Sequence, residues 1–384
     1  MSALKIRFDE VRAWIFNKAL PLWAGPGLDP ARGGSVETLD FSGRDAGAPF
    51  KRTRVQARQV YAFSHGHLMG WEGPGLAAAD HCWRFMQANA RRDDGAWMRL
   101  LGPAGGQLDP AADAYDTAFA LYALAWRLKC GDGDAMAEAH ATMDTLDELM
   151  AVGPGLGWFA AEDDPTRQLN PHMHLLEAFV ALAEAGGEAR FADLAGDVQR
   201  LFRDRMFEPG TGALAESYDA DWSPMRGPTR QVWPGHLYEW CWLLHEARRV
   251  TGLDLTGEAA ALYDLAEKRG LDADTRLADD ALAGDELVPS RSFRIWPQTE
   301  ALKAQLAMFE HQGRDTRARI AEVTDQLLDR YLAVEPAGAW CDRFGPGFQP
   351  IAKDIPASIL YHVLLAFSEL LRLEPQLSKA ASPG

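Results

Sequence analysis

Five basic side chains occupy matching places in the sequence, each within the first turns of an apolar segment with helical spacing. They are Arg58, His172, His174, His236 and His362. Imidazole titrates near neutral pH and can take and return a proton, while a guanidinium can stabilise an oxyanion. The shared position of these residue types indicates acid–base chemistry on a substrate that develops negative charge.

Two of the histidines are followed three residues later by glutamate, which gives the pairs His236–Glu239 and His174–Glu177. Positions i and i+3 of a helix share a face, and a carboxylate beside an imidazole fixes its tautomer. We therefore expect Glu239 to help position His236, and Glu177 to lie beside His174. The alternative is a helix-face contact only, and from spacing alone His362 is equally consistent with a core histidine.

Metal binding is a further alternative, because the sequence contains two His-x-His triplets as well as the two His-x-x-Glu pairs. On a helix, residues i and i+2 point about 200° apart, so such triplets chelate mainly on strands. No third ligand set appears at comparable spacing, and no phosphate-binding or nucleophile-elbow motif is present. We expect neither a metal nor another cofactor.

Six motif-like stretches, each opening an apolar helix, recur about every 60 residues, a period that fits a helical hairpin with two loops. Six hairpins account for the whole chain. The sequence therefore predicts an all-α (α/α)6 barrel, in which the first turns of six inner helices converge on one cavity. An irregular helical domain with accidental spacing is the alternative. The stretches begin at Arg58, Tyr115, Asn170, Trp233, Trp296 and Pro356.

Composition and charge narrow the class of protein. The chain has 384 residues, is 47% hydrophobic and carries a formal net charge of −16. Such a charge argues against nucleic acid and anionic membranes as partners. Since no stretch resembles an interdomain linker, we expect one catalytic domain over residues 1–378 and a disordered tail over 379–384.

The cysteines and the N-terminal sequence bear on location. The four cysteines are scattered without a Cys-x-x-Cys pair, a pattern that suits a reducing cytoplasm. The N-terminal segment carries charges among its apolar residues and predicts no signal peptide, and no apolar run reaches the length of a membrane span. We expect a cytoplasmic protein, and association as a homodimer through outer helices stays open.

The sequence resembles the N-acylglucosamine 2-epimerase superfamily, which includes mannose isomerases and cellobiose 2-epimerases. The matching stretches follow the order of the superfamily over nearly the full chain, and its fold is the (α/α)6 barrel. These stretches are residues 57–64, 170–178, 234–240, 296–300 and 361–362.

The resemblance implies roles for particular residues, and it implies catalysis without a redox cofactor or metal. His236 and His362 correspond to the acid–base pair, Arg58 and His174 to substrate contacts, and Glu239 to a residue that positions the neighbouring histidine. The complete set of substrate-binding candidates is Arg58, Asp116, His174, Glu177, Glu239, Trp296 and Glu300.

The predicted function is isomerisation of a free, mannose-like aldose to its ketose through an enediolate. The stretch 233–240, with proline before Gly-His, resembles the mannose-isomerase branch more than the cellobiose branch. N-acylglucosamine 2-epimerisation or another sugar 2-epimerisation is the nearest alternative, and a non-catalytic sugar-binding barrel is another. A glycoside hydrolase would instead use carboxylates such as Asp116, Glu239, Glu300 and Asp354.

Three arginines near the predicted cavity bear on whether the sugar is phosphorylated. They are Arg226, Arg230 and Arg294. Each could bind a phosphate group, but a solvated surface arginine is the safer interpretation.

Overall fold

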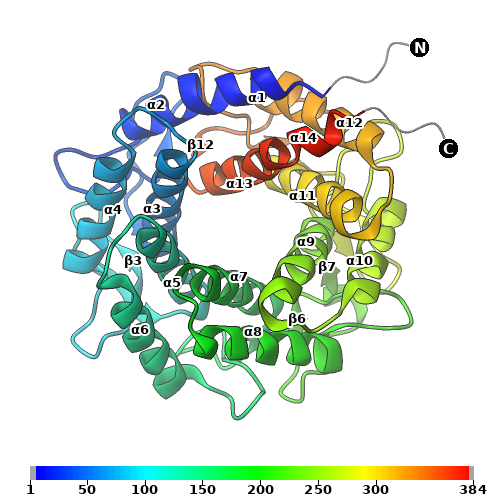
Figure 1. The fold of residues 1–384 in the computed structure, drawn as a ribbon, viewed down its shortest axis with the longest axis horizontal. Coiled ribbons are helices and arrows are strands. Elements are labelled where there is room, and N and C mark those ends of the chain that lie inside the picture. Colours follow the sequence, from blue (N-terminus) through cyan, green and yellow to red (C-terminus); the bar gives the residue numbers. More distant parts are fainter. Residues whose placement is uncertain (1–5, 380–384) are drawn as a thin grey trace.

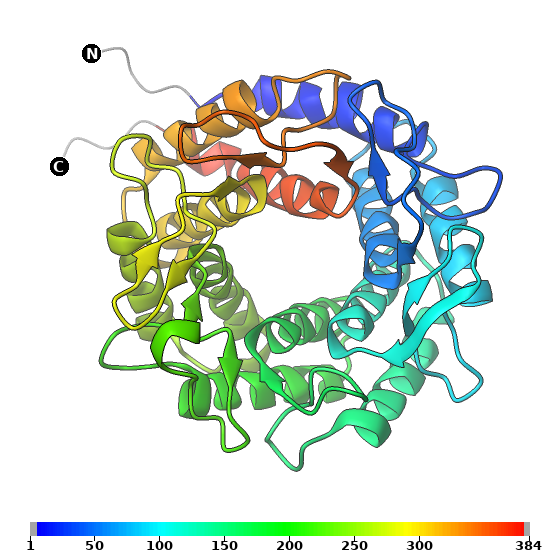
Figure 2. The same cartoon turned by 180° about the vertical axis from the view of Figure 1, so that it is seen from behind.

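The computed structural model describes residues 6–379, and these form a closed double ring of helices (Figures 1 and 2). The ring closes where α13 packs beside α3. The predicted (α/α)6 barrel is confirmed. The six inner helices are α3 (Thr53–Leu68), α5 (Ala114–Lys129), α7 (Leu169–Gly186), α9 (Pro234–Thr251), α11 (Ile295–Gln312) and α13 (Ile359–Arg372).

The outer ring surrounds these helices, and three of its members continue into π-helical segments, over Ile15–Ala19, Phe202–Met206 and Leu327–Tyr331. A short 3-10 turn covers Gly227–Thr229, and α14 (Glu374–Leu377) ends the described helices. The outer helices are α1 (Phe8–Trp14) with α2 (Leu20–Ala24), α4 (Gly75–Asn89), α6 (Ala135–Met150), α8 (Ala189–Leu201), α10 (Thr256–Arg269) and α12 (Arg317–Gln326).

Short antiparallel strands gather at the end of the ring where the inner helices begin (Figure 2). They form the pairs β1–β12, β5–β6 and β10–β11 and the three-stranded sheets β2–β3–β4 and β7–β8–β9. The strands are two to six residues long, so the helices dominate the fold, as in the predicted all-α barrel. Their bounds are β1 (Thr38–Leu39), β2 (Lys51–Arg52), β3 (Met98–Leu101), β4 (Gln107–Ala112), β5 (Arg167–Gln168), β6 (Ser217–Tyr218), β7 (Gln231–Val232), β8 (Leu282–Ala283), β9 (Val288–Pro289), β10 (Phe293–Arg294), β11 (Arg343–Phe344) and β12 (Ile355–Pro356).

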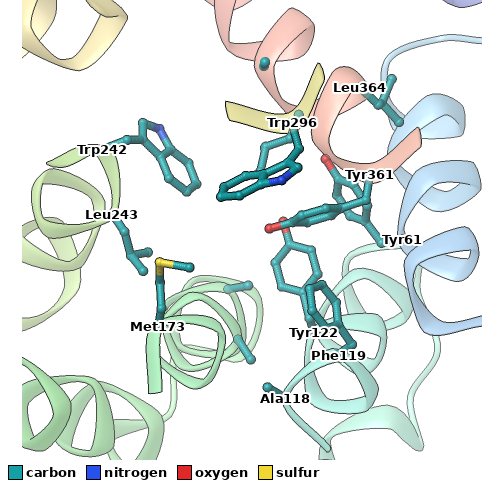
Figure 3. Packing of buried hydrophobic residues seen from close by; sticks show 14 of the residues in the cluster. Tyr61, Ala118, Phe119, Tyr122, Met173, Trp242, Leu243, Trp296, Tyr361 and Leu364 are labelled. Carbon is teal, nitrogen blue, oxygen red and sulfur yellow. The ribbon is translucent and has the colours of Figure 1, made fainter. Parts of the chain in front are cut away.

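The inner helices are buried along most of their length because they pack between the outer ring and the side chains that fill the centre. A helix that is apolar on all sides suits such a position. Phe119, Tyr361 and Trp296 point toward the middle of the ring (Figure 3), and the Phe119 and Tyr361 rings meet edge to face at 5.2 Å. These aromatic side chains fill part of the space inside the ring (Figure 3).

Two helix starts differ from the predicted ones. Helix α3 begins at Thr53, so Arg58 lies in its second turn, whereas His362 lies in the first turn of α13. Of the predicted tail, Lys379 accepts a 3.3 Å hydrogen bond from Arg317 through its carbonyl oxygen, and residues 380–384 lie outside the described residues. Within residues 6–379, no helix combines the length and apolarity needed to cross a membrane.

The start of α5 provides a test of how these helices are held in place. Asp113 caps α5 by accepting hydrogen bonds from the backbone amides of Tyr115 (2.8 Å) and Asp116 (3.1 Å). We expect Asp113→Ala to be about 1 kcal/mol less stable than Asp113→Asn, because both remove the charge but only asparagine keeps the cap. Urea denaturation measures the difference. Equal stabilities of the two variants would contradict this role, and the same pair of changes at Asp134, which caps α6 without a side-chain hydrogen bond, is the control.

Candidate active site

A cavity of about 250 Å³ opens at the end of the ring where the inner helices begin. Every inner helix contributes a residue of its opening turns or of the segment just before it. Helix N-termini carry partial positive charge, so their convergence favours negative charge in the cavity. The lining residues are Arg52, Arg58, Tyr115, Asn170, His174, Trp233, His236, Glu239, Arg294, Trp296, Asp342, Pro356, Ser358, Ile359 and His362.

His236 is held by a carboxylate that the sequence did not reveal. Its Nδ1 lies 2.8 Å from Oε2 of Glu216, and the other oxygen of Glu216 accepts a 3.3 Å hydrogen bond from the backbone of Trp233. The expectation that Glu239 fixes His236 is therefore wrong, because Glu216, from an irregular segment 20 residues earlier in the chain, already occupies Nδ1. Glu239 lines the cavity instead.

His362 has a matching arrangement, and it too lies near Trp296. Its Nδ1 lies 2.8 Å from Oε1 of Glu300. Burial, reinforced by the nearby Arg58 cation, lowers the pKa of His362 well below its ordinary value, so the neutral imidazole prevails near pH 7. The Trp296 ring centroid lies 5.2 Å from that of His236 and 5.8 Å from that of His362.

The two histidines therefore present the same atom to the cavity. An ionised carboxylate only accepts hydrogen bonds, so a carboxylate on Nδ1 makes Nδ1 the donor and leaves Nε2 without a proton. Neither Nε2 bonds to another residue within the part of the chain that the structure describes. Two bases thus face one cavity from either side of an indole ring.

His174 is the third cavity histidine, and its pairing with Glu177 follows the predicted i, i+3 geometry at 3.1 Å. Tyr361 donates a 2.6 Å hydrogen bond to Glu177 from behind. Burial lowers the pKa of His174 to about 3. Glu177 faces a separate cavity of about 220 Å³ toward the other end of the inner helices, so it supports His174 and lies outside the lining of the first cavity.

Arg58 is the cavity cation without a carboxylate partner among residues 6–379. Its Nη2 donates a 2.7 Å hydrogen bond to the Tyr115 hydroxyl, and its Nη1 a 3.4 Å bond to the carbonyl of Ser358. The guanidinium carbon lies 4.1 Å from the centroid of the Phe119 ring. A cation whose charge no acid offsets is available to a developing oxyanion.

Two groups of three side chains bring ligand atoms within 4.8 Å of one another: His174, Glu177 and Glu239, and Glu239, Glu300 and His362. At either place, a metal ion would compete with existing partners for the ligand atoms. Nδ1 of each histidine already pairs with a carboxylate, and Lys303 Nζ lies 2.6 Å from Glu300 and 3.8 Å from Glu239. The second group therefore already contains a cation.

Comparison with known proteins decides the family. Residues 33–366 match the family described as N-acylglucosamine 2-epimerase (GlcNAc 2-epimerase). The chain belongs to this family. A protein of Rhizobium meliloti (strain 1021) named mannose-6-phosphate isomerase is 35% identical over 96% of this chain and 97% of its own length. A D-mannose isomerase of Thermobifida fusca is 26% identical over 88% of each chain.

Solved structures agree with this assignment at the level of the fold. The cellobiose 2-epimerase from Spirochaeta thermophila DSM 6192 superposes with a TM-score of 0.86 and 22% identity over 97% of each chain. The resemblance on which the sequence interpretation depended is confirmed, and the chain is an enzyme of an isomerase and epimerase family.

Eight of the nine predicted site residues fall into two sets. Six line the cavity: Arg58, His174, His236, Glu239, Trp296 and His362. Glu177 and Glu300 lie one layer behind, each on a cavity histidine.

Asp116 belongs to neither set. It is fully buried and pairs at 2.6 Å with Arg54 of α3, which joins the starts of α3 and α5. The expectation that Asp116 contacts substrate therefore gains no support from its position: its carboxylate is already neutralised by Arg54, and it is absent from the cavity lining.

Sequence reasoning missed Glu216 and Lys303. Glu216 follows no helical spacing, because it lies in an irregular segment before β6, 20 residues ahead of His236. Lys303 does stand at i+3 from Glu300, so the spacing rule applied to the histidine pairs would have identified it.

The packing of the Trp296 ring explains why position 235 is a glycine. A Cβ at this position would lie 2.3 Å from the Trp296 ring. We expect Gly235→Ala to displace the indole from between the two histidines, to destabilise the fold by about 1–3 kcal/mol and to lower kcat/KM at least about tenfold. Gly257 occupies the same second helical position in α10 and has open space around it, so Gly257→Ala is the control. Equal activity of both variants would contradict the packing role.

His172, grouped with the cavity histidines from sequence, lies outside the cavity lining. Trp158 N donates to its Nε2 at 3.1 Å, and its Nδ1 donates to the Gln168 carbonyl at 2.8 Å. A Cβ on Gly157 would meet Nε2 at 2.3 Å, so the chain folds tightly over this ring. His172 therefore has a structural role.

Burial lowers the pKa of His172 from its ordinary value of 6.5 to about 4. Between these values the unfolded chain binds a proton that the folded chain does not, so the contribution to stability is complete above pH 6.5 and declines as pH falls. We expect His172→Gln to reduce the slope of unfolding free energy against pH by about 1.4 kcal/mol per unit between about pH 4.5 and 6. Urea titrations at several pH values measure it, with the surface variant His67→Gln as control. An unchanged slope for His172→Gln would contradict the prediction.

Proposed function

We propose that this enzyme is an aldose–ketose isomerase that interconverts mannose and fructose, with His236 and His362 exchanging the proton. The observation that carries the proposal is the matched pair of imidazoles, each held at Nδ1 by a carboxylate and open at Nε2 to one cavity. The names of the mannose-isomerising relatives point to the same class of sugar.

In the proposed reaction, one imidazole takes the proton from C2 of the open-chain aldose. The electrons form a C1=C2 bond, and negative charge develops on O1, where Arg58 lies without an acid partner. The proton on O2 then moves to O1, and return of a proton to C1 gives the ketose. His362 suits the first step, because burial favours its neutral form. His236 then suits the transfer to the oxygen atoms and the opening of the sugar ring.

Other cavity residues are proposed to bind the sugar. Glu239 faces the cavity, and both its carboxylate oxygens lack a hydrogen-bond partner among the described residues, so sugar hydroxyls are suitable donors to it. The Trp296 indole offers an apolar face, and His174 offers the imidazole nitrogen that Glu177 does not hold. Aromatic faces with a few polar groups are typical of sugar sites.

We further propose that the sugar is unphosphorylated. Arg226 and Arg230 pair with Glu208 at 2.8 and 2.6 Å, away from the cavity lining. Arg294 lines the cavity, but it lies 3.2 Å from the buried Asp280 and beside Asp342. Carboxylates that already offset these guanidinium groups leave little net attraction for a phosphate dianion.

A 2-epimerase is the second candidate, favoured by the description of the family. Return of the proton to the other face of C2 would use the same residues. A glycoside hydrolase is disfavoured by the positions of its four candidate carboxylates. Only Glu239 among these four lines the cavity. Glu300 and Asp116 pair with other side chains, and Asp354 is exposed.

Three further predictions concern the extent of the catalytic domain, the cellular compartment and the oligomeric state. We propose that residues up to 378 act as one catalytic domain, since the cavity draws on all six hairpins. Four unpaired cysteines support a reducing compartment such as the cytoplasm. Association as a homodimer stays a prediction, which the molar mass in solution tests.

The first experiment follows mannose, mannose 6-phosphate, N-acetylmannosamine and cellobiose by proton NMR in D₂O. We expect mannose to yield fructose with deuterium at C1, and mannose 6-phosphate to react with lower kcat/KM. Glucose as the product would establish the 2-epimerase, release of sugar from cellobiose a hydrolase, and absence of exchange in every sugar would overturn the proposal.

Variants then test the two proton-transfer residues. We expect His236→Asn and His362→Asn each to lower kcat at least about 100-fold, because each removes a general acid or base. His140→Asn is the control, since His140 also pairs with a glutamate, Glu188, but does so through Nε2 and on the outer ring. Initial rates of fructose formation measure all three. Retention of more than a tenth of the activity by either cavity variant would contradict its role.

A further inference from the structure

Lys303 is a fully buried cation directly behind the cavity. It lies one turn after Glu300 on α11, with Nζ 2.6 Å from Oε2 of Glu300 and 3.8 Å from Oε1 of Glu239. The ammonium also lies 4.1 Å from the centroid of the Trp242 ring. Lys303 does not line the cavity, so any effect on the reaction passes through its neighbours.

Three buried carboxylates surround this cation, namely Glu177, Glu239 and Glu300, none more than 4% exposed. Burying a carboxylate without a counter-charge is strongly unfavourable, and such a group takes up a proton instead. Burial and the neighbouring Glu239 raise the pKa of Glu300 well above its ordinary value, and Lys303 acts in the opposite direction. Lys303, in direct contact with Glu300, is therefore the group that favours its ionised form.

The protonation state of Glu300 determines which nitrogen of His362 carries the proton. The ionised form accepts from Nδ1–H across the 2.8 Å contact and leaves Nε2 bare. A protonated Glu300 would instead donate to Nδ1, and the proton of the neutral imidazole would then sit on Nε2. That tautomer cannot remove a proton from a sugar.

We propose that Lys303 is a positioning residue of the enzyme: it holds Glu300 as the ionised acceptor that keeps Nε2 of His362 free to take a proton. The kinetic part of this inference rests on the proposed function. Its structural part, the tautomer of His362, does not.

Other titratable groups face Glu300 and His362 from the neighbouring helices, and they are unchanged when Lys303 is replaced. A comparison of Lys303 variants therefore isolates the ammonium. These groups are Arg58 on α3, His174 and Glu177 on α7, His236 and Glu239 on α9 and Tyr361 on α13.

The kinetic experiment compares Lys303→Met with the wild-type enzyme over a range of pH, using mannose. We expect kcat to fall about 100-fold with KM changed less than about threefold, and the acidic limb of the kcat profile to move to higher pH. Lys129→Met is the matched control, since Lys129 also stacks on an indole (4.6 Å from the Trp126 ring) and pairs with a glutamate, Glu184, at 3.5 Å. A fall in kcat with an unmoved pH profile would indicate a merely structural role and overturn the proposal.

A double variant tests whether Lys303 acts through Glu300. In a Glu300→Gln background the carboxylate is gone, so we expect Lys303→Met to lower kcat less than about threefold further. A full additional loss would mean that the lysine acts by another route, and the proposal would be wrong.

The tautomer itself is measured on the wild-type protein by long-range ¹H–¹⁵N NMR of the imidazoles, with His362→Asn to assign the signals. We expect His362 protonated at Nδ1 and bare at Nε2. A proton on Nε2 overturns the proposal even if Lys303→Met fails to fold. This measurement needs no substrate, so an enzyme inert toward every sugar would refute the proposed function while leaving the role of Lys303 testable.

Discussion

The arrangement depends on one constraint: charged carboxylates must remain ionised in the dry interior of a helical ring. Glu216 and Glu300 each hold a cavity histidine by Nδ1 at 2.8 Å. An uncompensated buried carboxylate would take up a proton and lose its ability to fix the tautomer. Glu300 has the Lys303 ammonium as counter-charge, while Glu216 is less deeply buried and accepts a hydrogen bond from the backbone amide of Trp233, at the start of α9. In the proposed reaction, proton transfer at the cavity therefore depends on charges placed one layer behind it.

The ring supplies the geometry for this placement. Its inner helices are buried on nearly all sides, between the outer helices (Figure 1) and central side chains that include aromatic rings (Figure 3). Their opening turns meet at one cavity. Close packing sets the position of Trp296, whose ring occupies the space that a Cβ on Gly235 would need. Because the Trp296 ring lies within 6 Å of both His236 and His362, Gly235 on α9 helps to set the separation between the neighbouring His236 and His362 on α13.

Electrostatics separate the roles of the arginines. Arg52, Arg54 and Arg294 each face a buried carboxylate, on Glu37, Asp116 and Asp280 respectively, and they serve to join segments of the rim. Arg58 is different, because its partners are a phenol and a carbonyl. Its charge is therefore the one most available to an oxyanion. In the proposed reaction, a protein of net charge −16 would stabilise a negatively charged intermediate through Arg58, which has no carboxylate partner among the described residues, and through the converging helix N-termini.

The sequence by itself determined the barrel and most of the cavity lining. A motif near each inner helix start, repeated about every 60 residues, predicts six hairpins, and helix periodicity then directs the early side chains of each inner helix to one end. His236, His362, His174 and Arg58 could be placed this way because their positions depend on local geometry. Only the tertiary structure decided the partners. It joined His362 to Glu300 across 62 residues and Tyr361 to Glu177 across 184, gave Glu216 rather than Glu239 to His236, and engaged Asp116 with Arg54. Such contacts cross between helices, and helical periodicity carries no information about which side chain of a neighbouring helix lies opposite.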